Sequence, residues 1–127
     1  MERLFWICLG GALGTGARYL VAGWALKLLG TSFPYGTPAV NVLGSLLVGV
    51  VMHVGLSTEW MSPTVRLAAT VGLADGFTTY STFSYETLRL LQDGAWSFAL
   101  LNVFGTVVAC LAATLAGLAL GRWAVGS

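Results

Sequence analysis

The segment GFTTYSTFS, at residues 76–84, carries six hydroxyl side chains among its nine residues. Hydroxyl groups can donate hydrogen bonds to a small anion, and backbone carbonyls freed from a helix can bind a cation. Asp75-Gly76 comes at its start, where glycine is a poor helix former and aspartate competes for backbone hydrogen bonds. We therefore predict a helix interruption at about residues 75–79, with Gly76 as the breaking residue.

Two aromatic residues follow the predicted interruption. Tyr80 and Phe83 are three residues apart and so share one face of a helix. Aromatic ring edges carry positive potential, and two edges turned into a dry path would accept an anion without a full charge. Aromatic residues at this spacing more often serve packing alone, so this interpretation depends on the polar residues around them.

Two polar stripes with a spacing of four residues lie elsewhere in the chain. They are Thr37, Asn41 and Ser45, and Asn102, Thr106, Cys110 and Thr114. Residues at that spacing share a helix face. The amide of Asn41 needs hydrogen-bonding partners that hydrocarbon does not offer. We predict that Asn41 lines a polar path, and a hydrogen bond between neighbouring helices is the alternative.

The composition of the chain identifies the environment of these residues. Of its 127 residues, 57% are hydrophobic and 9% are charged, whereas soluble domains carry about 25% charged residues. The chain is therefore predicted to be an integral membrane protein of one domain. A net charge of +1 gives no basic surface for nucleic acid. The sequence also contains no nucleophile–base pair or metal-ligand cluster, so we expect no enzyme.

Four apolar runs are long enough to cross a bilayer, which takes roughly 20 residues. They cover about residues 4–29, 36–56, 64–91 and 95–123. The predicted fold is an all-α domain of four transmembrane helices, with the third interrupted near its middle. An even number of crossings places both termini on one side of the membrane.

The basic residues hardly favour one orientation over the other. One side would carry Arg3, Arg66 and Arg122, and the other Lys27 and Arg89. Because the excess of basic residues normally sets topology, we expect insertion in both directions. Two oppositely oriented copies would then pair about a two-fold axis in the membrane plane.

Three motifs together resemble the Fluc (CrcB) family of fluoride ion channels. They are GGALGTGARY at 10–19, YGTPAVNVLGSLLVG at 35–49 and GFTTYSTFSYE at 76–86, and the resemblance extends over nearly the whole chain. It implies an antiparallel, dual-topology homodimer in the inner (plasma) membrane. Two narrow pores would carry passive fluoride efflux, and a structural sodium ion would lie at the centre of the dimer.

The resemblance also implies roles for individual residues. The sodium ion would be held by the backbone carbonyls of Asp75 and Thr78. Arg18 matches a characteristic arginine of the first span, and Glu86 matches a vestibule glutamate. The anion pathway implied by the motifs, together with the polar stripes, consists of Asn41, Tyr80, Phe83, Ser81, Thr82, Thr106, Thr37 and Asn102.

Three positions depart from the pattern of the family. Asp75 replaces a usual glycine, Tyr80 replaces a phenylalanine, and Asn102 stands where an aromatic residue is common. Our hypothesis is a fluoride channel with altered permeation. A non-conducting or altered-selectivity subunit of a heterodimer is one alternative, which reconstitution of this chain alone would test. A small proton-coupled exporter is another, but it requires a carboxylate that the first span lacks.

Overall fold

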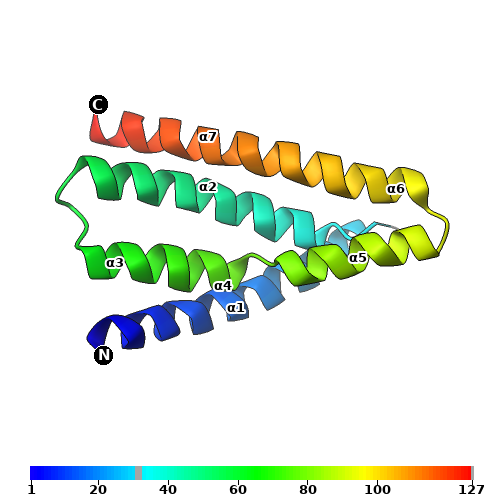
Figure 1. The fold of residues 1–127 in the computed structure, drawn as a ribbon, viewed down its shortest axis with the longest axis horizontal. Coiled ribbons are helices and arrows are strands. Elements are labelled where there is room, and N and C mark those ends of the chain that lie inside the picture. The colour runs from blue at the N-terminus through cyan, green and yellow to red at the C-terminus, as the bar shows by residue number, and fades with distance from the viewer. Residues whose placement is uncertain (31–32, 127) are drawn as a thin grey trace.

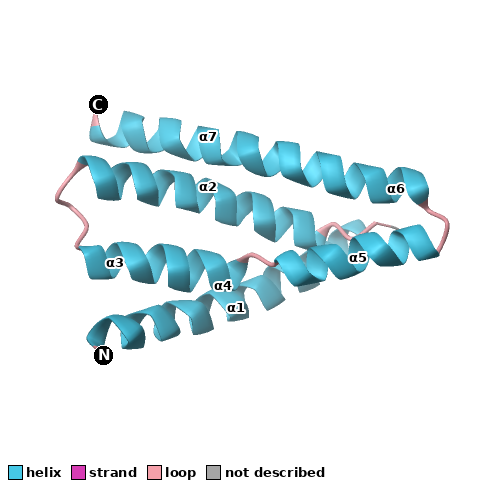
Figure 2. Cartoon of the chain, in the orientation of Figure 1, coloured by secondary structure: helices cyan, strands magenta, loops and turns pink. Residues whose placement is uncertain are grey.

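The structure is a computed structural model that describes residues 1–30 and 33–126. In that part of the chain the secondary structure is entirely helical, with short connections between the helices (Figure 2). The predicted connection between the first two spans includes residues 31–32, which lie outside the described residues. The all-α fold class is therefore confirmed for the part that the structure describes.

The helices form four long rods that lie side by side (Figure 1). The first two are α1, Glu2–Leu29, and α2, Gly36–Ser57. The third rod consists of α3 (Pro63–Leu67), a π-helical segment (Ala68–Ala74), α4 (Asp75–Phe77) and α5 (Tyr80–Gln92). The fourth rod consists of α6 (Trp96–Leu100), a second π-helical segment (Leu101–Gly105) and α7 (Thr106–Val125). The start of α1 and the end of α7 lie at the same end of the molecule (Figure 1).

Local chemistry accounts for where the third rod begins and ends. Pro63 occupies the first turn of α3, where its missing N–H is not needed, and the Ser62 hydroxyl accepts a hydrogen bond from the Val65 N–H at 3.2 Å. Gly94, with φ of 78°, lies in the turn that follows α5. This left-handed conformation is one that glycine adopts without a steric penalty.

Three of the described helices are long and apolar enough to cross a membrane: Glu2–Leu29, Gly36–Ser57 and Trp96–Val125. The third rod is not among them because extended residues divide it into shorter helical stretches. Large apolar side chains such as Leu13, Leu115 and Trp123 are exposed in the single chain. This distribution is typical of helices surrounded by lipid or by a second subunit.

Glycines allow the rods to approach one another closely. A Cβ added at Gly10 of α1 would lie 2.6 Å from the Ala68 carbonyl oxygen, and one at Gly76 would lie 2.7 Å from the Gly11 carbonyl oxygen. Between α2 and α7, a Cβ at Gly49 would lie 3.0 Å from the Gly117 Cα. Close backbone packing of this kind is the main source of helix association in lipid.

The helix ends later in the third rod than the sequence indicated. The assignment of Gly76 as the breaking residue was wrong, because residues 75–77 are helical and the Thr78 N–H still donates to the Ala74 carbonyl at 3.0 Å. The extended residues are Thr78 (φ −88°, ψ 164°) and Thr79 (φ −151°, ψ 121°). Gly76 instead supplies the close contact with α1, for which a residue without a side chain is required.

Candidate functional site

One side chain satisfies both backbone groups of an extended residue in the third rod. The Asn41 Nδ2–H donates to the Thr79 carbonyl at 3.1 Å, and the Thr79 N–H donates to Asn41 Oδ1 at 2.8 Å. A backbone amide buried without such partners would carry a desolvation penalty. Asn41 thus holds the extended segment against α2, and one of the two amide N–H groups is used in doing so.

A second side chain holds the end of α4. The Arg18 Nε–H of α1 donates to the Gly76 carbonyl at 3.1 Å, and the Thr15 hydroxyl approaches the same oxygen at 3.5 Å. Carbonyls in the last turn of a helix point outward without backbone partners, and a cation beside them is stabilising. The arginine expected from the resemblance therefore contacts the predicted break region directly.

Two carbonyl oxygens near the extended pair are left without partners by these contacts. In an unbroken helix the Asp75 carbonyl would accept from the Thr79 N–H, and the Thr78 carbonyl from the Thr82 N–H. The Thr79 N–H is bonded to Asn41 instead, and the Thr82 N–H donates to the Thr79 hydroxyl at 3.2 Å. No hydrogen bond to either carbonyl oxygen occurs among the residues that the structure describes.

These two carbonyls are the ones expected to hold sodium, and their chemistry fits a hard cation that prefers oxygen ligands. No group of three or more His, Cys, Asp or Glu residues with metal-binding geometry occurs within the described chain. The Asp75 side chain is exposed in the single chain.

The predicted aromatic pair follows directly on α5. The ring centroids of Tyr80 and Phe83 are 6.1 Å apart, with the planes tilted by 39°. Tyr80 is 81% exposed and Phe83 is half-buried. Ser81, the next expected pathway residue, is also exposed. The pair is therefore formed within one chain, and its outer side is open to a partner or to lipid.

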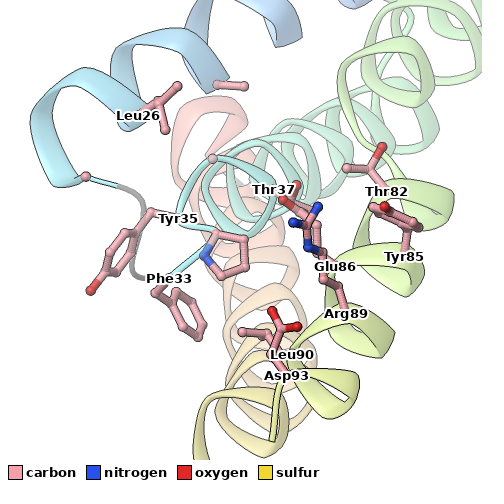
Figure 3. Close-up of a pocket in the computed structure, with 14 residues that line it drawn as sticks. Leu26, Phe33, Tyr35, Thr37, Thr82, Tyr85, Glu86, Arg89, Leu90 and Asp93 are labelled. Carbon is pink, nitrogen blue, oxygen red and sulfur yellow. The ribbon is translucent and has the colours of Figure 1, made fainter. Parts of the chain in front are cut away.

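A cavity of about 640 Å³ lies where the end of α1, the start of α2 and the outer part of α5 meet (Figure 3). Three of the expected residues line it: Thr37 of α2, which is buried, and Thr82 and Glu86 of α5. The Glu86 Oε1 atom is buried and has no hydrogen-bonding partner among the described residues. The structure thus brings part of the expected pathway together around one carboxylate.

Further polar residues in the cavity wall were not predicted from the sequence. Tyr85 and Arg89 of α5, and Asp93 directly after it, lie beside Glu86 in the lining (Figure 3). They are spaced four residues apart, and this spacing is the signal that would have grouped them on one helix face. The basic Arg89 between two acidic residues makes this wall mixed in charge.

The remaining two expected residues lie away from this cavity. Thr106 is 7% exposed and lines a separate cleft of about 230 Å³ with Phe33 and Pro38. Asn102 is completely buried, and its Nδ2–H donates to the Thr87 hydroxyl at 2.8 Å. The polar stripe of the fourth rod therefore does not join the cavity within one chain.

The sequence of this chain is similar to those of known proteins over nearly its whole length. A family model described as "CrcB-like protein, Camphor Resistance (CrcB)" matches residues 5–118. A protein of Sorangium cellulosum is 48% identical over 122 residues, covering 96% of both chains. One of Anaeromyxobacter dehalogenans is 48% identical over 126 residues, covering 99% of this chain and all of that one. One of Citrifermentans bemidjiense is 48% identical over 122 residues, covering 96% of this chain and 98% of that one.

Each of these relatives is named "Fluoride-specific ion channel FluC". They are channels and not enzymes, and with the three apolar helices they identify a multi-pass membrane protein. The resemblance noted in the three sequence motifs is confirmed by matches over nearly the full length. The chain belongs to the CrcB-like family.

Proposed function

We propose that this chain forms a fluoride-selective channel for passive fluoride efflux across the inner (plasma) membrane. The main support for the proposal is sequence identity. Relatives named as fluoride-specific channels are 48% identical to this chain over at least 96% of its length. The geometry adds physical support, because the polar and aromatic groups that such a channel needs gather around one extended segment of the third rod.

Fluoride is small and strongly hydrated, so a narrow pathway has to replace the water that the ion loses. Without such compensation, the free energy of moving an ion from water into a low-dielectric environment is prohibitively high. Asn41 retains one amide N–H beyond the bond that it makes to Thr79. The rings of Tyr80 and Phe83 offer positive edges, and Ser81 and Thr82 offer hydroxyl groups. Together these groups would line a water-poor route for the anion.

A second, inverted copy of the chain would complete the pathway. Four polar or aromatic residues in the first two turns of α5 are exposed in the single chain: Tyr80, Ser81, Ser84 and Tyr85. Polar groups facing lipid at membrane depth are costly, so this side of α5 requires a protein partner. The even distribution of basic residues allows both orientations. An antiparallel dimer built this way would contain two equivalent pores.

A sodium ion at the dimer axis would be held by the carbonyls of Asp75 and Thr78 from both copies. The fit rests on the observation that Asn41 and Thr79 divert the N–H groups that would otherwise occupy these two oxygens. A bound cation would supply positive charge that lowers the cost of an anion nearby. Arg18 would keep the adjacent Gly76 carbonyl out of the coordination shell by bonding it.

Efflux from proteoliposomes tests the proposed activity. Vesicles holding this chain alone are loaded with potassium fluoride or potassium chloride, and efflux is followed with ion-selective electrodes after valinomycin is added. We expect rapid fluoride release and chloride release no faster than from protein-free vesicles. Absence of fluoride release, or equal release of both halides, would overturn the proposal.

Dual topology is tested separately with a protease-sensitive C-terminal tag. If the chain inserts in both directions, about half of the tags should be cleaved from outside sealed membrane vesicles, and the rest only after detergent is added. Cleavage of all tags or of none from outside would contradict the antiparallel dimer.

A further inference from the structure

Three residues form a hydrogen-bonded relay from the fourth rod to the backbone of the aromatic pair. They are Asn102, Thr87 and Phe83. We propose that Asn102 is a positioning residue that, through Thr87, sets the orientation of Phe83 and thereby the preference of the pathway for fluoride over chloride. This inference rests on the proposed channel function and deepens it.

The direction of the relay is fixed by chemistry. Asn102 Nδ2–H donates to Thr87 Oγ1 at 2.8 Å, and an amide nitrogen can only donate. The hydroxyl proton of Thr87 therefore points away from Asn102, and it is directed to the Phe83 carbonyl at 2.8 Å. The bond from Asn102 therefore determines where the Thr87 hydroxyl proton points, and the two hydrogen bonds can form in only one direction.

The donor end of the relay, Asn102, is buried inside the protein and does not lie on its surface. Asn102 is 0% exposed and lies in the π-helical segment Leu101–Gly105. Its Oδ1 atom is buried and has no donor among the described residues. An unpaired buried oxygen lowers stability, so packing alone would favour an apolar residue here. Short π-helical segments are frequently found at functional sites, which agrees with a polar residue kept at this position.

The relay acts at the backbone unit that carries the Phe83 ring. A threonine hydroxyl bonded to the carbonyl four residues earlier competes with the backbone at that carbonyl and often bends a helix there. Here the threonine is itself tied to the fourth rod, so the Phe83 carbonyl is held relative to that rod. The Phe83 ring, whose centroid is 6.1 Å from that of Tyr80, is carried by the backbone that these two bonds hold. Because ring edges and faces differ in potential, a small rotation changes how well the pair accepts an anion.

Two variants of Thr87 test the relay in proteoliposomes. Thr87→Val removes the hydroxyl at nearly constant shape. We expect the fluoride-to-chloride flux ratio to fall by about fivefold, the factor for losing the one hydrogen bond that reaches the Phe83 carbonyl. Thr87→Ser keeps the hydroxyl and should restore the ratio. Thr70→Val is the matched control, because Thr70 makes the same kind of bond, 2.8 Å to the Arg66 carbonyl, without an asparagine donor. It should leave the ratio unchanged.

A double variant separates positioning from folding. Asn102→Leu removes both the donor and the unpaired oxygen, so Thr87→Val combined with Asn102→Leu leaves no buried polar group unpaired in the relay. We expect this protein to melt at or above the wild-type temperature. Its flux ratio should equal that of Thr87→Val alone, because both changes interrupt one path. A ratio that returns to the wild-type value with the second change would overturn the relay.

The outcomes distinguish the inference from the function on which it rests. A wild-type chain that releases no fluoride overturns the channel proposal. A wild-type chain that releases fluoride selectively, together with a Thr87→Val variant of unchanged flux ratio, overturns only the role of Asn102. A Thr87→Val variant that loses melting temperature and total flux in parallel, with the ratio unchanged, would show a purely structural contact.

Discussion

Asn41 of α2 and Thr79 of the third rod are joined by two hydrogen bonds, 3.1 Å from the amide nitrogen to the carbonyl and 2.8 Å from the N–H to the amide oxygen. The side chain replaces the backbone partners that Thr79 lost when the helix ended. The same contact diverts the N–H that would have capped the Asp75 carbonyl. One asparagine thus maintains the extended segment and exposes an oxygen that a cation can use.

Replacement of Asn41 by leucine should strongly destabilise the protein. Both backbone groups of Thr79 would remain partly buried without partners, at a cost of about 1 to 3 kcal/mol each. We expect unfolding free energy to fall by roughly 2 to 6 kcal/mol and fluoride efflux to be lost. The measurements are unfolding in mixed micelles of increasing dodecyl sulfate content and efflux from proteoliposomes.

Ser45→Ala is the control for Asn41. It lies one turn further along the same face of α2 and makes no side-chain hydrogen bond within the described chain. Its effect on unfolding should stay within about 0.5 kcal/mol. If both variants unfold alike, the two bonds to Thr79 do not contribute as the geometry indicates.

Asp75 places a carboxylate on the same rod as the proposed anion route, five residues before Tyr80. At about 4 Å a carboxylate and an anion repel each other by about 1 to 4 kcal/mol, for dielectrics between those of water and a protein surface. Asp75→Asn should therefore raise fluoride efflux, and the gain should shrink as salt is added. The control is Glu59→Gln, an exposed carboxylate in the connection between α2 and α3. Slower efflux in Asp75→Asn would indicate that the charge serves a bound cation instead.

The hydroxyl of Tyr80 and its ring should contribute differently. Tyr80→Phe keeps the ring beside Phe83, so we expect fluoride selectivity to be retained. Tyr80→Ala removes an aromatic pair worth about 0.5 to 1.5 kcal/mol beyond simple burial, and selectivity should fall by up to about tenfold. Tyr19→Ala removes an exposed tyrosine of α1 that makes no ring pair in the described chain and serves as control. Loss of selectivity in Tyr80→Phe would assign the anion contact to the hydroxyl.

The sequence was sufficient for features that depend on composition and period. Low charge and long apolar runs predicted an all-helical membrane protein, and the motifs predicted its family. The weak helix formers around Gly76 located the end of the helix only to within a few residues. The residue at which the helix ends depends on Asn41, which is far away in the chain and contacts Thr79 only once α2 and the third rod have packed.

Other features of the site depend on tertiary contacts in the same way. The predicted roles of Asn102 and Arg18 rested on helix faces and on the resemblance, and neither identified Thr87 or the Gly76 carbonyl as a partner. Neither π-helical segment was predicted, because π-helical segments have no simple sequence period. The ion pathway, the sodium site and the inverted dimer remain predictions because they involve an ion or a second copy of the chain.

Two glycines of α1 should respond oppositely to the same substitution. A Cβ at Gly10 would lie 2.6 Å from the Ala68 carbonyl oxygen and 3.1 Å from the Leu73 nitrogen, both of which are backbone atoms that cannot rotate away. Gly10→Ala should push α1 off the third rod and cost about 1 to 3 kcal/mol, as overpacking does elsewhere.

At Gly16 a Cβ would meet nothing within 4 Å, so Gly16→Ala should stabilise the helix by up to about 1 kcal/mol. Unfolding of the two variants in mixed micelles measures both effects on one helix with one chemical change. Because α1 also carries Arg18, separation of the rods in Gly10→Ala should weaken the bond to the Gly76 carbonyl and reduce fluoride efflux. Equal shifts in the two variants would mean that α1 does not pack on the third rod through Gly10.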